Sequence, residues 1–333
     1  MGVELPPLPA AGGRPGPEPE PGGALAGSPG AGPAGSPGEG EEEGAIAVCR
    51  RIGAAAAAAG AGTVWITGAP PEGGGSGVVP PWCDPFTLAG ALAHRLEVAM
   101  IGVVSCLPAG RHPSVVARDL TTLDVLSGGR AALRFGWDPA RPAALTDICE
   151  HLVDAAALCT AMLRGEAAYD GPRYRVSGAW NLPPPRRPGG PPVLVDSPAA
   201  LSDSLVSGRR GYGGAAGLAW RLGAVVDAVV CPPDPRTVSA WRTVLDGGQS
   251  RGARKPGLLC AFDPRGERVR GRSLPAARDG GADGVIVRLA PDSGRAVAPY
   301  SPMSAELPDL LAASYSPWTG PGDRGRGTSS PAG

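Results

Sequence analysis

The chain has 333 residues, enough for one large α/β barrel or for two ordinary domains. Its 31 basic and 31 acidic residues cancel, so bulk electrostatics favour neither a nucleic acid nor a membrane surface as partner. The seven cysteines form no C-x-x-C pair and the three histidines are not spaced as metal ligands, which argues against a zinc site or a disulfide framework. The chain also has no apolar run that could span a bilayer and no secretory leader, so we predict a cytoplasmic protein without a metal.

The two ends of the chain differ in composition from its middle. Residues 1–44 are rich in Pro, Gly, Ala, Ser and Glu, and residues 316–333 are similar. Such segments bury too little apolar surface to offset the entropy that is lost on ordering, so we predict that both are disordered. A single folded domain is therefore expected over residues 45–315.

Between the two ends, short apolar runs alternate with helix-length segments, as in a parallel sheet with crossover helices. Strands are predicted at 63–67, 98–106, 130–136, 192–196, 224–231, 257–262 and 284–289. Helices are predicted at 46–60, 85–95, 113–126, 144–164, 235–245, 274–279 and 304–314. These elements predict an α/β barrel, but a closed (β/α)₈ barrel needs one more strand, and the first strand is the one not located.

The most strongly patterned segment covers residues 111–130. Pro113 stands where a helix accepts proline, in its first turn, and apolar residues recur at helical spacing over 115–126. Two glycines follow the last turn, where a left-handed cap favours glycine. The segment therefore predicts a helix, a glycine stop and an immediate strand.

The same segment resembles the most recognisable stretch of the luciferase-like monooxygenases, where an arginine, a proline-started helix, an aspartate and a Ser-Gly-Gly-Arg stop recur in this order. The matching positions are Arg111, Pro113, Asp124, Ser127, Gly128, Gly129 and Arg130. The resemblance extends in the right order over about 46–315, and it implies a (β/α)₈ TIM barrel that is imperfect at its first strand. It also implies that Asp124 and Arg130 are buried ion-pair partners at the bottom of the barrel, without a catalytic role.

Barrel enzymes build their sites from the carboxyl ends of strands and the loops that follow. The residues at these ends include Thr67, Gly68, Ser105, Cys106, Gly136, Trp137, Asp138, Asp196, Ser197, Cys231, Pro232, Phe262 and Asp263. In the family, FMN or the deazaflavin F420 lies across the barrel mouth, which implies cofactor contacts from Ser105, Cys106, Gly136, Trp137, Asp196 and Ser197. Ser197 matches the loop that holds the cofactor's phosphate, although Ser197 and its neighbours could also be only a turn and a helix N-cap.

Two places depart from the family pattern. Family members usually carry His, Glu or Asp after the tryptophan of the second strand, whereas this chain continues from Trp65 with Ile-Thr-Gly. The Gly-x-Gly run after the fourth strand is reduced to Gly136, and the bulky Trp137 follows it. No catalytic residue is therefore assigned.

The resemblance implies a flavin-dependent oxidoreductase or monooxygenase that binds reduced FMN or F420 and acts on a small organic substrate. A flavin reductase and a second copy of the chain are its candidate protein partners. The alternative is a non-catalytic barrel homologue that acts as a subunit or a binding module, which the two departures favour.

Overall fold

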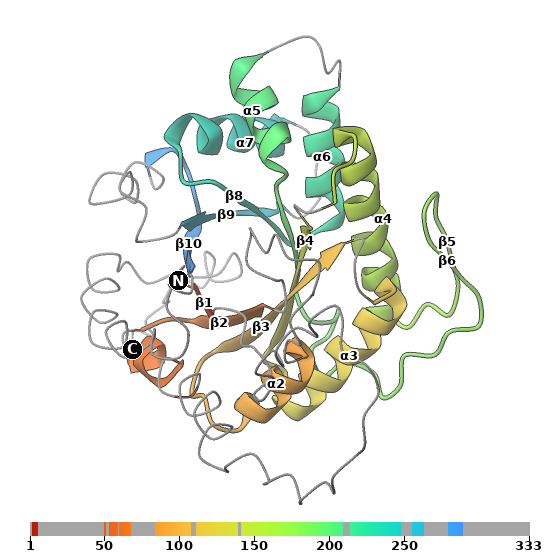
Figure 1. Cartoon of the computed structure of the whole chain (residues 1–333). Helices are drawn as coiled ribbons and strands as arrows, with labels where there is room; N and C mark the ends of the chain where they lie inside the picture. The colour runs from red at the N-terminus through yellow and green to blue at the C-terminus, as the bar shows by residue number, and fades with distance from the viewer. Residues whose placement is uncertain are drawn as a thin grey trace, which may run out of the picture.

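The computed structural model describes residues 2–5, 50, 53–58, 60–67, 84–107, 111–138, 141–208, 214–247, 255–262 and 279–288. Eight parallel strands form a closed barrel in the order β1-β10-β9-β8-β7-β4-β3-β2 (Figure 1). Their bounds are β1 Gly2–Leu5, β2 Thr63–Thr67, β3 Met100–Leu107, β4 Ala131–Trp137, β7 Val193–Asp196, β8 Ala228–Cys231, β9 Gly257–Phe262 and β10 Gly284–Arg288. The predicted fold class is confirmed, and the barrel is imperfect in that β1, β7 and β8 have only four residues each.

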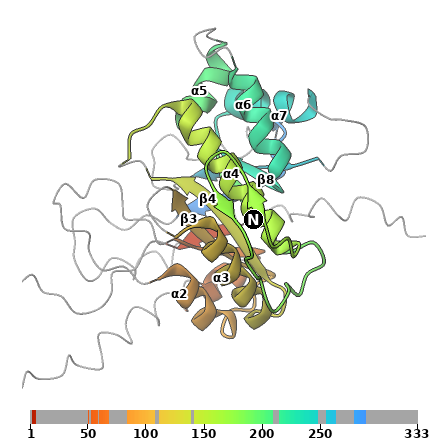
Figure 2. The same cartoon turned by 90° about the vertical axis from the view of Figure 1, so that its right-hand side faces the viewer.

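The helices lie outside the curled sheet. Their bounds are α2 Pro85–Ala93, α3 Pro113–Leu126, α4 Leu145–Leu163, α5 Ala199–Ser207, α6 Ala215–Val225 and α7 Pro235–Gly247. Helices α2, α3 and α4 follow one another around the side of the barrel formed by β2, β3 and β4, and α5, α6 and α7 gather at β7 to β9 (Figures 1 and 2). Helices α2, α3, α4, α6 and α7 thus pack against strands, whereas α5 packs mainly on α6 and α7.

The first strand lies where the sequence predicted disorder. Residues 2–5 pair in parallel with both β10 and β2, and so they close the barrel. The prediction was wrong for these four residues because composition averaged over a long segment hides a short strand. That strand is held by backbone hydrogen bonds from two neighbours, which do not depend on the composition around it. The rest of both predicted disordered segments lies outside the described residues.

A second difference concerns the strand predicted over 224–231. The structure begins β8 at Ala228 and ends α6 at Val225, so one apolar run is divided between a helix and a strand. Helix α5 begins at Ala199, just after Ser197, where a helix N-cap was one of the two readings of the sequence. Helix α6 lies in a weakly patterned stretch for which no helix was predicted. The predicted helix at 304–314 lies outside the described residues, as does the one at 274–279 except for Asp279.

Side chains on the strands alternate between two apolar clusters. Outward-facing residues such as Ile101, Leu133 and Val195 belong to the larger cluster, which includes the buried faces of the helices. The smaller cluster lies inside the barrel and consists of Trp65, Val104, Ala132, Leu194, Ala228, Val230, Ala261 and Ile286. Because side chains on a strand alternate with a period of two, these clusters decide which residues of each strand can face the barrel mouth.

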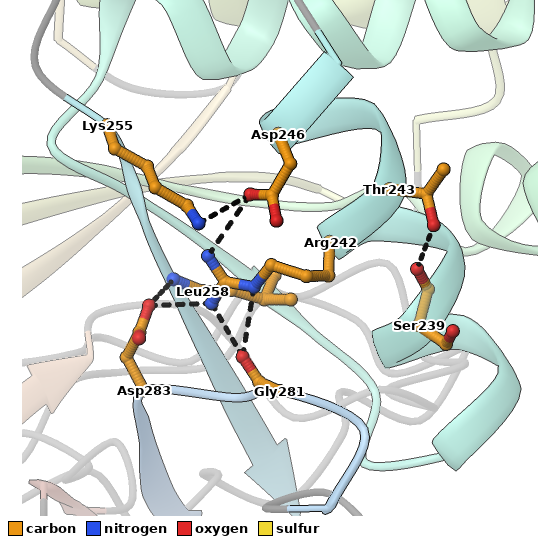
Figure 3. Close-up of polar contacts among 8 residues, drawn as sticks. All are labelled: Ser239, Arg242, Thr243, Asp246, Lys255, Leu258, Gly281 and Asp283. Atoms are coloured by element: carbon orange, nitrogen blue, oxygen red, sulfur yellow. Dashed lines mark hydrogen bonds and ion pairs between the residues drawn. The ribbon is translucent and has the colours of Figure 1, made fainter.

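At the N-terminal edge of the barrel, two aspartates that directly precede strands bind the backbone of the neighbouring strands. The carboxylate of Asp227, before β8, accepts a hydrogen bond of 2.9 Å from the backbone N–H of Val193. The carboxylate of Asp283, before β10, accepts one of 2.8 Å from the backbone N–H of Leu258. Arg242 of α7 donates to the same Asp283 carboxylate at 2.7 Å, which ties this helix to the edge (Figure 3).

The family-like segment forms the predicted helix, but its two charged residues have other partners than expected. Helix α3 has the predicted bounds, and the two glycines after it have φ values of +72° and +90°. In the described part of the chain, Arg130 donates to the carbonyls of Leu96 (2.9 Å) and Val98 (3.0 Å), just after α2. Asp124 accepts from the backbone N–H of Arg186 at 2.8 Å. The predicted ion pair is therefore wrong, because each charged group satisfies backbone groups that no helix or strand pairs.

A small hairpin of β5 (Tyr169–Asp170) and β6 (Arg175–Val176) lies outside the barrel beside α4 (Figure 1). The buried carboxylate of Asp154 in α4 holds it. This carboxylate accepts hydrogen bonds from the Tyr169 hydroxyl (2.5 Å) and from the backbone N–H groups of Arg173 (2.7 Å) and Tyr174 (2.8 Å). Burial and the neighbouring Asp154 carboxylate raise the pKa of Tyr169, so its hydroxyl stays a donor.

Candidate functional site

Three of the predicted site residues meet inside the C-terminal mouth of the barrel. Cys106 of β3, Gly136 of β4 and Asp196 of β7 stand at neighbouring strand ends. A Cβ atom added to Gly136 would lie 3.2 Å from Oδ2 of Asp196 and 3.6 Å from Sγ of Cys106. Glycine at this position therefore leaves room for the carboxylate and the thiol to approach the backbone of β4.

The other predicted residues point away from the mouth. Trp137 packs against the outer apolar cluster, its Nε1 donates to the carbonyl of Arg141 (2.8 Å), and its ring centroid lies 5.6 Å from that of His151. Ser105 falls between the inward-facing Val104 and Cys106, and so it faces outward by alternation. Trp137 and Ser105 thus face the helix layer.

Ser197 also faces the helix layer, through its hydroxyl group. Its Oγ lies 2.7 Å from Oγ of Ser202 in α5, and Nε1 of Trp241 in α7 donates to the same Ser202 oxygen at 3.1 Å. The backbone N–H of Ser197 donates to the carbonyl of Val230 (2.7 Å). These contacts fix the turn between β7 and α5.

Two residues that the sequence analysis did not select lie directly beneath the mouth. The side chain of Arg134 is only 1% exposed, and its Nε lies 3.3 Å from Oδ1 of Asp196. Its guanidinium carbon lies 5.3 Å from the ring centroid of Trp65 in β2, a cation–π distance. Alternation could have identified Arg134, because it lies two residues from Gly136 in an otherwise apolar strand.

Trp65 crosses the intervening strand β3 to reach Arg134. The ring lies directly against the backbone of Gly102, where an added Cβ would overlap it. Trp65 belongs to the inner apolar cluster and is buried. Trp65 and Arg134 therefore form the floor of the mouth, and the Asp196 carboxylate lies against this floor.

The N-terminus of α5 opens at the same end of the barrel. The helix begins at Ala199, three residues after Asp196, and no described side chain caps it. Its first two residues, Ala199 and Ala200, are exposed. Because the first N–H groups of a helix have no partner within the helix, such an end binds anions, phosphate above all. Asp196 turns its carboxylate into the barrel toward Arg134, which fits an anion at the helix end.

Arg111 of the family-like segment links two helices near the mouth. Its guanidinium contacts the carboxylates of Asp84 (2.7 Å) and Asp119 (2.8 Å) and lies 5.8 Å from the ring centroid of Phe86. Burial raises the pKa of Asp119 above its usual value, although the arginine opposes this. Arg111 thus joins the start of α2 to α3.

Two absences hold for the part of the chain that the structure describes. No three His, Cys, Asp or Glu side chains gather closely enough to hold a metal ion. No helix there combines the length and the apolar character that crossing a bilayer requires.

Comparison with known proteins identifies this architecture. Residues 30–208 match the family model described as luciferase-like monooxygenase, while no curated protein matches the chain. An F420-dependent secondary alcohol dehydrogenase in complex with an F420-acetone adduct is similar in structure, with a TM-score of 0.59, 10% identity, and 82% of this chain and 96% of that chain covered. Apo-MsnO8 is also similar in structure, with a TM-score of 0.52 at 16% identity, and the match covers 80% of this chain and 90% of that chain.

EDTA monooxygenase (EmoA) from Chelativorans sp. BNC1 has a TM-score of 0.50 at 17% identity, and this match covers 68% of this chain and 57% of that chain. At such identities, the likeness to solved structures shows a common fold. The family match covers more than half of the chain, from before β2 to the end of α5.

Proposed function

The chain belongs to the luciferase-like monooxygenase family, and we propose that it is an oxidoreductase that binds FMN or F420 across the mouth of its barrel. Its substrate would be a small organic molecule that reaches the cofactor from solvent. Cys106, Gly136 and Asp196 would line the site from inside the barrel, and the first turn of α5 would hold the cofactor's phosphate.

The observation that carries this proposal is the direction of the Asp196 carboxylate. A carboxylate beside a phosphate would weaken binding, yet Asp196 is the last residue of β7 and precedes the uncapped end of α5 by three residues. Its Oδ1 faces Arg134 and its Oδ2 faces Gly136, so both oxygens are directed into the barrel. The helix end is thereby left to an anion, which FMN and F420 both supply.

When bound, the cofactor supplies the hydride or oxygen chemistry, and the protein supplies orientation and electrostatics. The side chains of Cys106 and Asp196, which lie over Gly136, would contact the cofactor from inside the barrel. Oδ2 of Asp196 can accept a hydrogen bond from a hydroxyl or N–H group that lies above it. The apolar inner wall formed by Val104, Leu194 and Val230 keeps water from beneath the site.

The cofactor determines which partner is needed. A protein that uses reduced FMN would depend on a flavin reductase, whereas F420 would arrive already reduced. The F420-dependent alcohol dehydrogenase among the similar structures supports the second choice, and the EDTA monooxygenase is a relative described as an oxygenase. We also propose that the protein is cytoplasmic and that it assembles as a homodimer.

Titration of the purified chain with FMN and with F420 tests the proposal. We expect saturable quenching of the fluorescence of one cofactor and a shift of its visible absorbance band. A negative charge at the start of α5, as in Ser197→Glu, should weaken this binding. Ser207→Glu, which places the same charge at the far end of α5, is the control and should bind as the wild type does. Failure of the wild type to bind either cofactor would contradict the proposal.

The second candidate function is a non-catalytic barrel that serves as a subunit or a binding module. The specific observation in its favour is the floor beneath the mouth, where Arg134 and Trp65 fill the space that a deep substrate pocket would need. Thr67 at the end of β2 also supplies no acid or base. Binding of a cofactor without turnover of any substrate would favour this candidate.

A further inference from the structure

Three charged groups of alternating sign lie near one another at one side of the barrel: Arg134, Asp196 and the N-terminus of α5. The guanidinium is buried beneath the mouth, the carboxylate lies at the mouth with its side chain 22% exposed, and the positive end of the α5 dipole follows three residues later. The Arg134 guanidinium and the N-terminus of α5 are therefore alternative partners for the Asp196 carboxylate. In the structure the carboxylate lies beside Arg134, with 3.3 Å between Oδ1 and Nε.

We propose that Arg134 is a positioning residue for cofactor binding: it holds the Asp196 carboxylate inside the barrel and so keeps the N-terminus of α5 available for the cofactor's phosphate. This inference rests on the proposed function, and it assigns a role to a residue of the barrel interior. Arg134 is buried beneath the mouth, and its guanidinium contacts the Asp196 carboxylate. It acts through Asp196.

Arg134 can serve as an anchor because its own position is fixed. Trp65 lies against it on one side, and Asp196 lies on the other. Trp65 in turn is held against the backbone of β3, since residue 102 is a glycine and leaves space for the ring. The contacts thus cross four neighbouring strands, β2, β3, β4 and β7, below the mouth. A buried guanidinium so enclosed needs a nearby anion, because burial penalises an uncompensated charge.

Without Arg134, the carboxylate would have another favourable place. Asp and Asn side chains bind readily to the first N–H groups of a helix, and Asp196 is close to those of α5 in sequence. A carboxylate there would occupy the phosphate position and repel a second anion. Loss of Arg134 should therefore weaken the binding of phosphate-bearing ligands more than that of the same ligands without phosphate.

FMN and riboflavin make this test direct, because they differ only by the phosphate group. The readout is the ratio of the dissociation constant of riboflavin to that of FMN, which a general loss of packing would not change. In Arg134→Met this ratio should fall at least tenfold relative to the wild type. In the double variant Arg134→Met/Asp196→Asn it should return to the wild-type value within about threefold, since the repelling charge is gone. If F420 is the cofactor, F420 and its deazariboflavin core, which lacks the phosphate and the side chain attached to it, replace the two flavins.

Asp196→Asn alone provides a second arm if Arg134→Met does not fold. With Arg134 in place, the inference predicts that this variant keeps the wild-type ratio within about threefold, because the carboxylate already faces away from the phosphate. A tenfold rise in the ratio would show that Asp196 repels the phosphate despite Arg134, and would overturn the inference. An unchanged ratio in a folded Arg134→Met variant would overturn it too. Absence of binding to the wild type would instead overturn the proposed function, and the inference with it.

Discussion

Asp283 and Leu258 exchange two hydrogen bonds at the N-terminal edge of the barrel. The Leu258 N–H donates to the Asp283 carboxylate (2.8 Å, Figure 3). The Asp283 N–H donates to the Leu258 carbonyl (2.7 Å). Asp227 and Val193 make the same two contacts at 2.9 and 2.8 Å. In both cases an aspartate directly before one strand caps the start of its neighbour. These aspartates therefore fix the register of β10 on β9 and of β8 on β7.

Replacing Asp283 with alanine should destabilise the fold. The change leaves the buried N–H of Leu258 without its acceptor and removes a carboxylate from Arg242, so we expect a loss of about 2–3 kcal/mol. Urea unfolding followed by circular dichroism measures it. Asp170→Ala is the matched control, since Asp170 and its partner Arg175 are 77% and 81% exposed and their pair should contribute little. Equal losses in both variants would contradict the assigned role.

Arg130→Ala should lower stability without a selective effect on cofactor binding. The guanidinium of Arg130 donates to the carbonyls of Leu96 and Val98 at the far end of the barrel from the mouth. Loss of these charge-assisted hydrogen bonds should cost about 2–3 kcal/mol. Thermal melting and FMN or F420 titration on the same sample separate the two effects. An unchanged melting temperature together with lost binding would show that Arg130 acts at the mouth and not at the far end of the barrel.

Gly171→Ala should release the hairpin from α4. A Cβ atom at this position would overlap Oδ1 of Asp154, the carboxylate that holds the hairpin. Overpacking of this kind typically costs about 1–3 kcal/mol. Gly217 in α6 has nothing within 4 Å of an added Cβ, so Gly217→Ala should stabilise by about 0.5–1 kcal/mol. Opposite signs in thermal melting are the expected result, and destabilisation by both would contradict it.

Alkylation should distinguish the thiol at the mouth from those in the core. Cys106 is partly exposed, whereas Cys149 and Cys159 are buried, and burial raises the pKa of each of these two thiols to about 12. At about pH 8 only roughly 10⁻⁴ of such a thiol is ionised, so iodoacetamide should label Cys106 before Cys149 and Cys159. Peptide mass spectrometry at several times gives the rates, with the urea-unfolded protein as control. FMN or F420 should slow the labelling of Cys106, and equal rates in the folded protein would refute its place at the mouth.

The sequence predicted those elements whose limits are encoded locally. Helix α3 begins at a proline and ends before two glycines, and its bounds agree with the prediction. Strand β1 could not be found in this way, because its four residues become a strand only by pairing with β10 and β2. The division of 224–231 between α6 and β8 likewise depends on the contacts of Asp227, which no local pattern shows.

At the site, the sequence located the strand ends but did not decide which way their side chains face. Cys106, Gly136 and Asp196 point inward, whereas Ser105 and Trp137 are each one residue away and point outward. A shift of one residue reverses the face of a strand, so proximity to a strand end was not sufficient. Alternation counted from Gly136 would have found Arg134. The pairing of Arg134 with Asp196 could not have been inferred, because β4 and β7 are far apart in the chain.

The last prediction concerns Ser197, which precedes the first turn of α5. Its hydroxyl lies 2.7 Å from that of Ser202, so we expect Ser197→Ala to lose this contact and to keep most of its affinity for FMN. Ser197→Glu instead adds a negative charge next to the helix end, and it should weaken FMN binding at least tenfold, or by about 1.4 kcal/mol, while riboflavin binding stays the same. Ser207→Glu places the same charge at the other end of α5 and should have no such effect. Fluorescence titration of the three variants measures this, with melting temperatures to confirm folding. If Ser197→Ala weakens FMN binding as strongly as Ser197→Glu does, the hydroxyl itself contacts the phosphate. If neither does, the phosphate lies elsewhere.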